Sequence, residues 1–218
     1  MEGKGERPME IAFVLYPGMT ALDLIGPYEV LAHQEGVAAH FVAATGEPVT
    51  ADAGLVIAPT TTFGELDRAD VVVVPGSSAW ERVLADGAVA AWLREVHPTA
   101  TWTTSVCTGS TLLAEAGILT GRPATTHWAV RDALAARGAV VSTDRVVRDG
   151  SVITAAGVSA GIDMALTLVG LIWGDDRAKF TQLVIEYAPE PPYDAGSPET
   201  APAELVAFAR SALEGRSA

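Results

Sequence analysis

Short apolar segments alternate with longer segments of helical period through most of this chain. Continuous apolar runs that end at turn residues predict buried strands, and these lie at residues 10–15, 40–45, 55–63, 69–76, 101–106 and 124–127. Segments whose apolar positions recur every three to four residues predict helices at 20–35, 79–97, 109–119, 128–138 and 159–187. Breaks in two of these helices are expected near Gly87 and at Gly174-Asp175.

The order of these segments predicts a single α/β sheet structure. Strands that alternate with helices favour a doubly wound, mostly parallel sheet with helices on both faces. Residues 140–157 differ, because two strand-like runs flank Asp149-Gly150, which is typical of a hairpin turn. Ligands of such sheets bind at the carboxyl ends of the strands. Two corners there are of interest, Pro75-Gly76-Ser77 and Cys107-Thr108-Gly109.

The pattern divides the chain into three parts. Residues 1–9 form a polar leader, and residues 10–187 form one α/β domain of ordinary size. Residues 188–218 contain a proline-rich loop and then a helix, which we expect to pack on the same domain. No internal repeat is visible.

Composition and charge exclude several classes of function. The net charge of −13 argues against nucleic acid and anionic membrane partners, which require basic surfaces. No run of about 18 apolar residues and no apolar signal-peptide core occur, so a cytoplasmic protein is expected. One cysteine excludes an internal disulfide, and four widely separated histidines show no metal-ligand spacing. We therefore expect no metal.

The single cysteine, Cys107, lies where a β-branched run meets a helical one. At such a corner a thiol faces the sheet edge, and the N–H groups of the following helix favour the thiolate. Gly109 matches the second glycine of the G-x-S-x-G nucleophile elbow, whereas Ser105 replaces the first. A buried structural cysteine is the alternative.

Four stretches resemble the ThiJ/PfpI superfamily and, within it, the isocyanide hydratase branch. They read YPGMTALDLIGPYEVLA (16–32), VVVVPGSSAW (71–80), TSVCTGSTLLAEAGILTGRPATTHWA (104–129) and VITAAGVSAGIDMALTLV (152–169). The resemblance implies a flavodoxin-like α/β sandwich, related to the class I glutamine amidotransferase fold, that usually forms a homodimer. The cysteine stretch is shared with the ligand-binding halves of AraC-type regulators.

The resemblance also implies roles for particular residues. Cys107 matches the nucleophile, and Asp23 matches an acidic residue that hydrogen-bonds near the thiol. The N–H groups of Gly76 and Thr108 match donors that form an anion pocket. His127 matches a histidine near the nucleophile. Thr108 stands where protease-like members carry histidine, which argues against peptide hydrolysis.

Two further residues are expected to line the substrate pocket, Ser77 at the first corner and Trp80 as part of an apolar wall. Other interpretations of the matched residues stay open. Asp23 is also placed to cap a helix, and His127 is also compatible with a purely structural role. Gly76 is compatible with a role in backbone geometry alone.

Three functions follow as hypotheses. The first is cofactor-independent hydration of a small-molecule isocyanide to an N-substituted formamide, through a thioimidate on Cys107. The second is a non-catalytic ligand or redox sensor, in which an exposed thiol of low pKa is oxidised. The third is a broader cysteine hydrolase or glyoxalase-like enzyme. Because only about 30 residues follow the long helix, we expect no helix-turn-helix DNA-binding domain.

Overall fold

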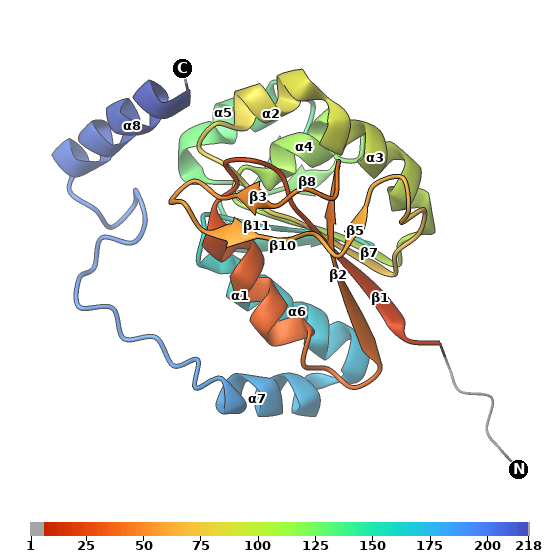
Figure 1. Ribbon diagram of the computed structural model, residues 1–218. Helices are drawn as coiled ribbons and strands as arrows, with labels where there is room; N and C mark the ends of the chain where they lie inside the picture. Colours follow the sequence, from red (N-terminus) through yellow and green to blue (C-terminus); the bar gives the residue numbers. More distant parts are fainter. Residues whose placement is uncertain (1–6, 218) are drawn as a thin grey trace, which may run out of the picture.

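A central sheet lies between two layers of helices (Figure 1). The structure is a computed structural model that describes residues 7–217, with side chains up to residue 213. Within these residues seven strands form the sheet in the order β10-β11-β7-β6-β1-β2-β5. They are β1 (Met9–Val14), β2 (Val37–Ala43), β5 (Thr61–Thr62), β6 (Val71–Val74), β7 (Trp102–Val106), β10 (Val146–Asp149) and β11 (Val152–Ala155).

The sheet has the direction of pairing that the sequence predicts. β1 lies between β2 and β6 and is parallel to both, with Phe13 opposite Phe41 and Val73. β7 is parallel to β6 and β11. β10 alone among these strands is antiparallel, because Asp149 and Val152 pair across the predicted hairpin turn. The mostly parallel α/β fold and the hairpin are thus confirmed.

Helices cover both faces of the sheet (Figure 1). One face carries α1 (Ala21–Leu31), α6 (Ala160–Trp173) and α7 (Asp175–Val184). The other carries α2 (Trp80–Asp86), α3 (Ala88–Val96), α4 (Gly109–Glu115) and α5 (Arg131–Ala135), with short 3-10 helices at His97–Thr99 and Trp128–Val130. Both predicted helix breaks are confirmed, since Gly87 separates α2 from α3 and Gly174 separates α6 from α7.

The two layers explain the all-apolar run in β6. Its four valines, Val71–Val74, are fully buried because the strand is central and covered on both sides. Burial of each valine side chain contributes roughly 1.5–2 kcal/mol to folding. The well-packed centre gives rigid support to the strand ends, where the two predicted corners lie.

Two predicted strands are shorter in the structure. The run 55–63 divides into β4 (Val56–Ile57) and β5, because Pro59 between them lacks the N–H that a ladder requires. β4 pairs with β3 (Val49–Thr50) and not with the main sheet. The run 124–127 contributes only to β8 (Pro123–Ala124), which pairs with β9 (Val140–Val141). Thr126 instead turns its hydroxyl toward the carbonyl oxygen of Cys107, 3.0 Å away.

The last part of the chain returns to the carboxyl edge of the sheet. After α7 the chain runs along one side of the molecule without a regular element and ends in α8 (Ala203–Ser217), beside α2 (Figure 1). Two contacts hold it there. Arg131 pairs with Glu199 at 3.2 Å, and the Arg210 guanidinium lies 5.1 Å from the ring centroid of Trp128.

No helix within residues 7–217 has both the length and the apolar character needed to cross a bilayer.

Candidate active site

Four loops meet at the carboxyl ends of the central strands. Cys107 directly follows β7, and Gly76 lies two residues after β6. Val158 follows β11, and Asp23 lies in the first turn of α1, after β1. The topology therefore brings together residues far apart in sequence at the edge where parallel sheets bind ligands.

Cys107 has a strained backbone. Its φ is +59°, and within residues 7–217 only Glu186 shares a positive φ among residues with a side chain. The Cys107 N–H donates to the carbonyl oxygens of Ala155 and Ala156 at 3.1 and 2.8 Å. Its own carbonyl accepts from the hydroxyl groups of Ser110 and Thr126 at 3.2 and 3.0 Å. These bonds hold a conformation that costs about 1–3 kcal/mol, which is typical of a nucleophile elbow.

Gly109 is required by the close approach of two strand ends. A Cβ at this position would lie 2.3 Å from the carbonyl oxygen of Val74 and 2.8 Å from that of Pro75. No side chain fits there without separating the corner after β6 from the corner after β7. The glycine that the elbow pattern predicts at this position is therefore required by the close packing of the two corners.

Asp23 lies fully buried beside the thiol. Its Oδ2 accepts a 2.8 Å hydrogen bond from the N–H of Gly76, whereas its buried Oδ1 has no nitrogen or oxygen donor among the described residues. The carboxyl therefore does not cap α1, which was the alternative role. Burial is the main reason why the pKa of Asp23 rises from 3.8 to about 7, and the Gly76 N–H and the Cys107 thiol only partly oppose it. Both protonation states are thus populated near neutral pH.

The surroundings of Cys107 favour the neutral thiol over the thiolate. Burial raises the pKa of Cys107, and the negative charge of Asp23 raises it further. Hydrogen bonds from the N–H groups of Val158 and Thr108 lower it, but their effect is smaller. Burial and Asp23 therefore act against the thiolate that the helix N-terminus was expected to favour. Cys107 lies beside a carboxyl group whose own pKa is raised, so a proton can be shared between the two groups.

Hydrogen bonds inside the corners change the roles expected of Gly76 and Ser77. The Gly76 N–H is engaged with Asp23, so it positions the carboxyl group and is not free for substrate. A Cβ at Gly76 would lie 2.6 Å from the backbone nitrogen of Thr108. The absence of a side chain at Gly76 therefore also lets the two corners come close together. The Ser77 N–H donates to Thr108 Oγ1 at 2.7 Å, and that hydroxyl donates to Ser77 O at 2.9 Å. Ser77 Oγ donates to Gly18 O at 2.6 Å.

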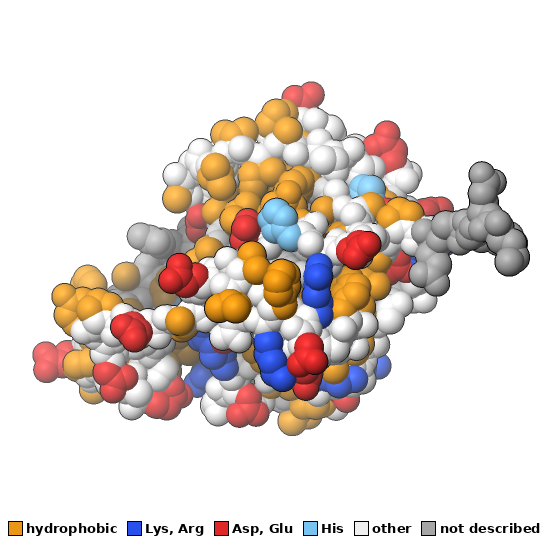
Figure 2. Space-filling view, turned by 90° about the horizontal axis from the view of Figure 1, so that it is seen from below, with side chains coloured by type: hydrophobic (Ala, Val, Ile, Leu, Met, Phe, Trp, Pro, Cys, Tyr) orange, Lys and Arg blue, Asp and Glu red, His pale blue; other side chains and the backbone are white. Residues whose placement is uncertain are grey.

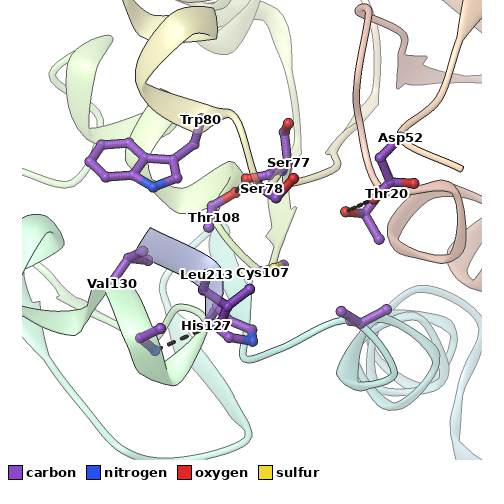
Figure 3. Close-up of a pocket in the computed structure, with 12 residues that line it drawn as sticks. Thr20, Asp52, Ser77, Ser78, Trp80, Cys107, Thr108, His127, Val130 and Leu213 are labelled. Carbon is purple, nitrogen blue, oxygen red and sulfur yellow. Dashed lines mark hydrogen bonds between the residues drawn. The ribbon is translucent and has the colours of Figure 1, made fainter. Parts of the chain in front are cut away.

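A pocket of about 210 Å³ opens at the Cys107 sulfur (Figure 3). Cys107 and its neighbour Thr108 form the base, although only 5% of each is exposed. One side is polar, with Thr20 Oγ1 donating to Asp52 Oδ2 at 2.9 Å. The other residues that line the pocket are Ser77, Ser78, Trp80, His127, Ala129, Val130, Val158 and Leu213. The structure thus brings Ser77, Trp80, Thr108 and His127 to one cavity with Cys107, while Asp23 and Gly76 lie behind it.

His127 reaches the pocket in a fixed tautomer. Its Nδ1 accepts from the Ala129 N–H at 3.3 Å and caps the following 3-10 helix, so the hydrogen of the neutral ring is on Nε2. Burial, and then the charge of Arg131, lower its pKa, which keeps the ring neutral. A Cβ at Gly157 would lie 2.9 Å from the ring, so this glycine makes room for it. His127 therefore both caps this 3-10 helix and lines the pocket.

Other residues of the site were not predicted. Tyr16 donates from its hydroxyl to Pro75 O at 2.6 Å and so ties the β1 loop to the β6 corner. The only sequence feature that could have pointed to Tyr16 is its position in the Tyr-Pro-Gly turn, shortly before Asp23. Leu213 comes from α8, and no sequence pattern indicated that this helix contacts the site. Within the described part of the chain, no three acidic, cysteine or histidine side chains gather as a metal site.

Residues 9–171 match the model of the DJ-1/PfpI family. The chain belongs to this family. It is 46% identical to an isonitrile hydratase of Pseudomonas putida over 93% of this chain and 89% of that protein.

Two further relatives are informative. A ThiJ/PfpI family protein from Pseudomonas syringae, known from a crystal structure, has 41% identity and a TM-score of 0.87 over 96% of this chain and 90% of its own. An HTH-type transcriptional regulator of Pseudomonas aeruginosa is 31% identical over 76% of this chain, but over only 51% of its own length.

Proposed function

We propose that this protein hydrates isocyanides to N-substituted formamides, with Cys107 as the nucleophile. The observation that carries the proposal is the Asp23 carboxyl group, held by the Gly76 N–H beside the only thiol of the chain. Its pKa of about 7 suits a group that alternately takes and gives a proton. Similarity to the isonitrile hydratase of Pseudomonas putida supports the choice of substrate.

In the first step the carbon of R–N≡C becomes bonded to sulfur. The Asp23 carboxylate takes the thiol proton as Sγ attacks the isocyanide carbon. The same proton then passes from Asp23 to that carbon, which gives the thioimidate R–N=CH–S–Cys107. Because the carboxylate is regenerated, the site is ready to activate water.

In the second step water replaces sulfur. The Asp23 carboxylate takes a proton from water as its oxygen attacks the thioimidate carbon, and this proton passes to nitrogen. The resulting R–NH–CH(OH)–S–Cys107 loses its carbon–sulfur bond, and the hydroxyl proton returns through Asp23 to sulfur. The product is R–NH–CHO, and one water has been consumed.

The pocket suits this reaction in size and polarity. Its apolar side, with Trp80, Val130 and Leu213, is placed to receive the R group (Figure 3). The Nε2–H of His127 and, on the polar side, the hydroxyl of Thr20 also line the pocket and are able to hold water. The reaction as written needs no cofactor.

Two other functions remain as alternatives. A ligand or redox sensor is favoured by the similarity to a transcriptional regulator. The raised pKa of Cys107 opposes rapid oxidation, since the thiolate is the species that reacts with peroxide. A broader hydrolase or glyoxalase-like enzyme is disfavoured by the resemblance, because Asp23 stands where many such members carry glutamate.

A turnover assay distinguishes the three. Wild type, Cys107→Ala and Asp23→Ala are incubated with cyclohexyl isocyanide, and formamide is followed by absorbance. Turnover in wild type and its loss in both variants supports the hydratase. Wild type without turnover, but with a stable Cys107 sulfinate after mild peroxide, supports the sensor. Turnover of a glyoxal or a peptide instead supports the third function.

We further infer a homodimer in the cytoplasm. The helical layer of α1, α6 and α7 exposes apolar side chains among charged ones, and Figure 2 shows this side of the molecule. The exposed apolar residues of this layer are Leu22, Leu171, Phe180, Leu183 and Val184. Light scattering coupled to size-exclusion chromatography gives twice the chain mass if the inference is right, and the chain mass if it is wrong.

A further inference from the structure

We propose that Leu213, on the C-terminal helix α8, limits the size of the R group that the pocket accepts. The inference rests on the proposed hydratase function. Leu213 lines the same pocket as Cys107, Thr108 and His127 (Figure 3). It is far from these residues in sequence, so α8 adds a wall that the α/β sheet does not supply.

Two contacts fix α8 to the segment that follows His127. The Arg210 guanidinium lies over the Trp128 ring, with 5.1 Å between the guanidinium carbon and the ring centroid. Upstream of α8, Glu199 Oε1 lies 3.2 Å from Arg131 Nη1. Trp128 and Arg131 flank Val130, which is itself a residue of the pocket wall. These contacts therefore hold Leu213 in place relative to Val130.

A second hollow of about 300 Å³ lies next to the catalytic pocket. Leu213, Trp80, Ala129 and Val130 line both spaces, so together they form the partition between them. Beyond the partition the hollow is lined by Glu81, Ala133 and Arg210.

Leu213 is the member of this partition that comes from α8, outside the helices that cover the sheet. Trp80 is 8% exposed and is covered by the Arg137 guanidinium at 5.0 Å, and it begins α2. Leu213 is half-buried and belongs to a helix at the surface. Shortening it joins the two spaces, and enlarging it closes the catalytic pocket further. The partition therefore predicts exclusion of large aryl isocyanides by the native chain.

The test compares one small and one large substrate. We expect Leu213→Ala to raise kcat/KM for naphthyl isocyanide relative to cyclohexyl isocyanide by about tenfold or more, the range for pocket changes of this size. Leu213→Trp is expected to lower the same ratio. Leu205→Ala is the control, because Leu205 lies on α8, is 48% exposed and lines neither space. Thermal unfolding of each variant checks that α8 has not detached.

A second readout does not depend on isocyanide turnover. Cys107 is the only cysteine, so its alkylation by iodoacetamide and by a bulky naphthyl iodoacetamide is followed by intact mass, with both reagents at the same alkaline pH. We expect Leu213→Ala to accelerate the bulky reagent selectively, even if wild type turns over no isocyanide and the proposed function fails. Unchanged ratios in both assays, with Leu213→Ala folded, overturn the proposal.

Discussion

Replacing Asp23 by asparagine separates the chemical role of the carboxyl group from its structural one. Asparagine keeps the shape and leaves an oxygen to accept the 2.8 Å bond from Gly76 N–H, but it neither takes nor gives a proton. We expect kcat for isocyanide hydration to fall by about 10²–10⁴-fold, the usual contribution of a positioned general acid–base.

The same variant is expected to be more stable than wild type at pH 8. The pKa of Asp23 is about 7 in the folded chain and near 3.8 when unfolded, so the folded state binds the proton more tightly. A raised carboxyl pKa means that stability is lost as pH rises from about 4 to about 7, because the buried group must then ionise. This difference in pKa corresponds to at most about 4 kcal/mol, which Asp23→Asn avoids.

The assay combines kinetics with urea unfolding between pH 4 and pH 8. Wild type should lose unfolding free energy across this interval more steeply than the variant does. Glu95→Gln is the control, since it removes an exposed carboxylate from another helix, α3. We expect this control to leave both kcat and the pH slope unchanged, because Glu95 is exposed and does not line the pocket.

Either of two results would refute this reasoning. Retention of most of the activity by Asp23→Asn would mean that the carboxyl group transfers no proton in the rate-determining steps. An unfolding free energy as dependent on pH as that of wild type would mean that Asp23 is not the buried group that titrates near neutrality.

Three other substitutions test the frame around the thiol. Gly76→Ala places a Cβ 2.6 Å from the backbone nitrogen of Thr108. We expect kcat/KM for hydration to fall by about 10²-fold, as for other displacements of about 1 Å near a reacting group. Wild-type kinetics would contradict the close approach of these two corners. Thr108→Val removes both hydroxyl bonds to Ser77, so urea unfolding should show a loss of about 1–3 kcal/mol, and an unchanged midpoint would count against it. Gly109→Ala should lower the melting temperature far more than Gly46→Ala, which meets nothing within 4 Å, and equal effects would show that the corner tolerates a side chain.

Much of the fold followed from local pattern. The four valines of β6 and the β-branched run of β7 are apolar throughout because both faces of the sheet are covered, and that pattern predicted central strands. The corners that follow them had to lie at one edge, because parallel strands share a direction. Pro59 explains the main error, since one missing N–H divided a predicted strand into two short ones.

The electrostatics of the site did not follow from sequence. The sequence places Cys107 before a helix, which alone favours a thiolate. The pKa of the thiol is instead set by burial and by Asp23, and both depend on how α1 packs over the β7 corner. In the same way, the sequence shows that Gly76 has an N–H group to donate, but only the tertiary structure shows that Asp23 accepts this hydrogen bond. Leu213 was not foreseen, because contacts of α8 depend on the path of the chain after α7.

Trapping the covalent intermediate tests the central claim most directly. Wild type and Cys107→Ala are mixed with cyclohexyl isocyanide, quenched in acid during turnover and analysed by peptide mass spectrometry. Attack by sulfur predicts that the peptide containing Cys107 gains the mass of one isocyanide, and that the variant forms neither adduct nor formamide. Formamide production by Cys107→Ala at the wild-type rate, with no adduct on the native chain, would contradict the claim.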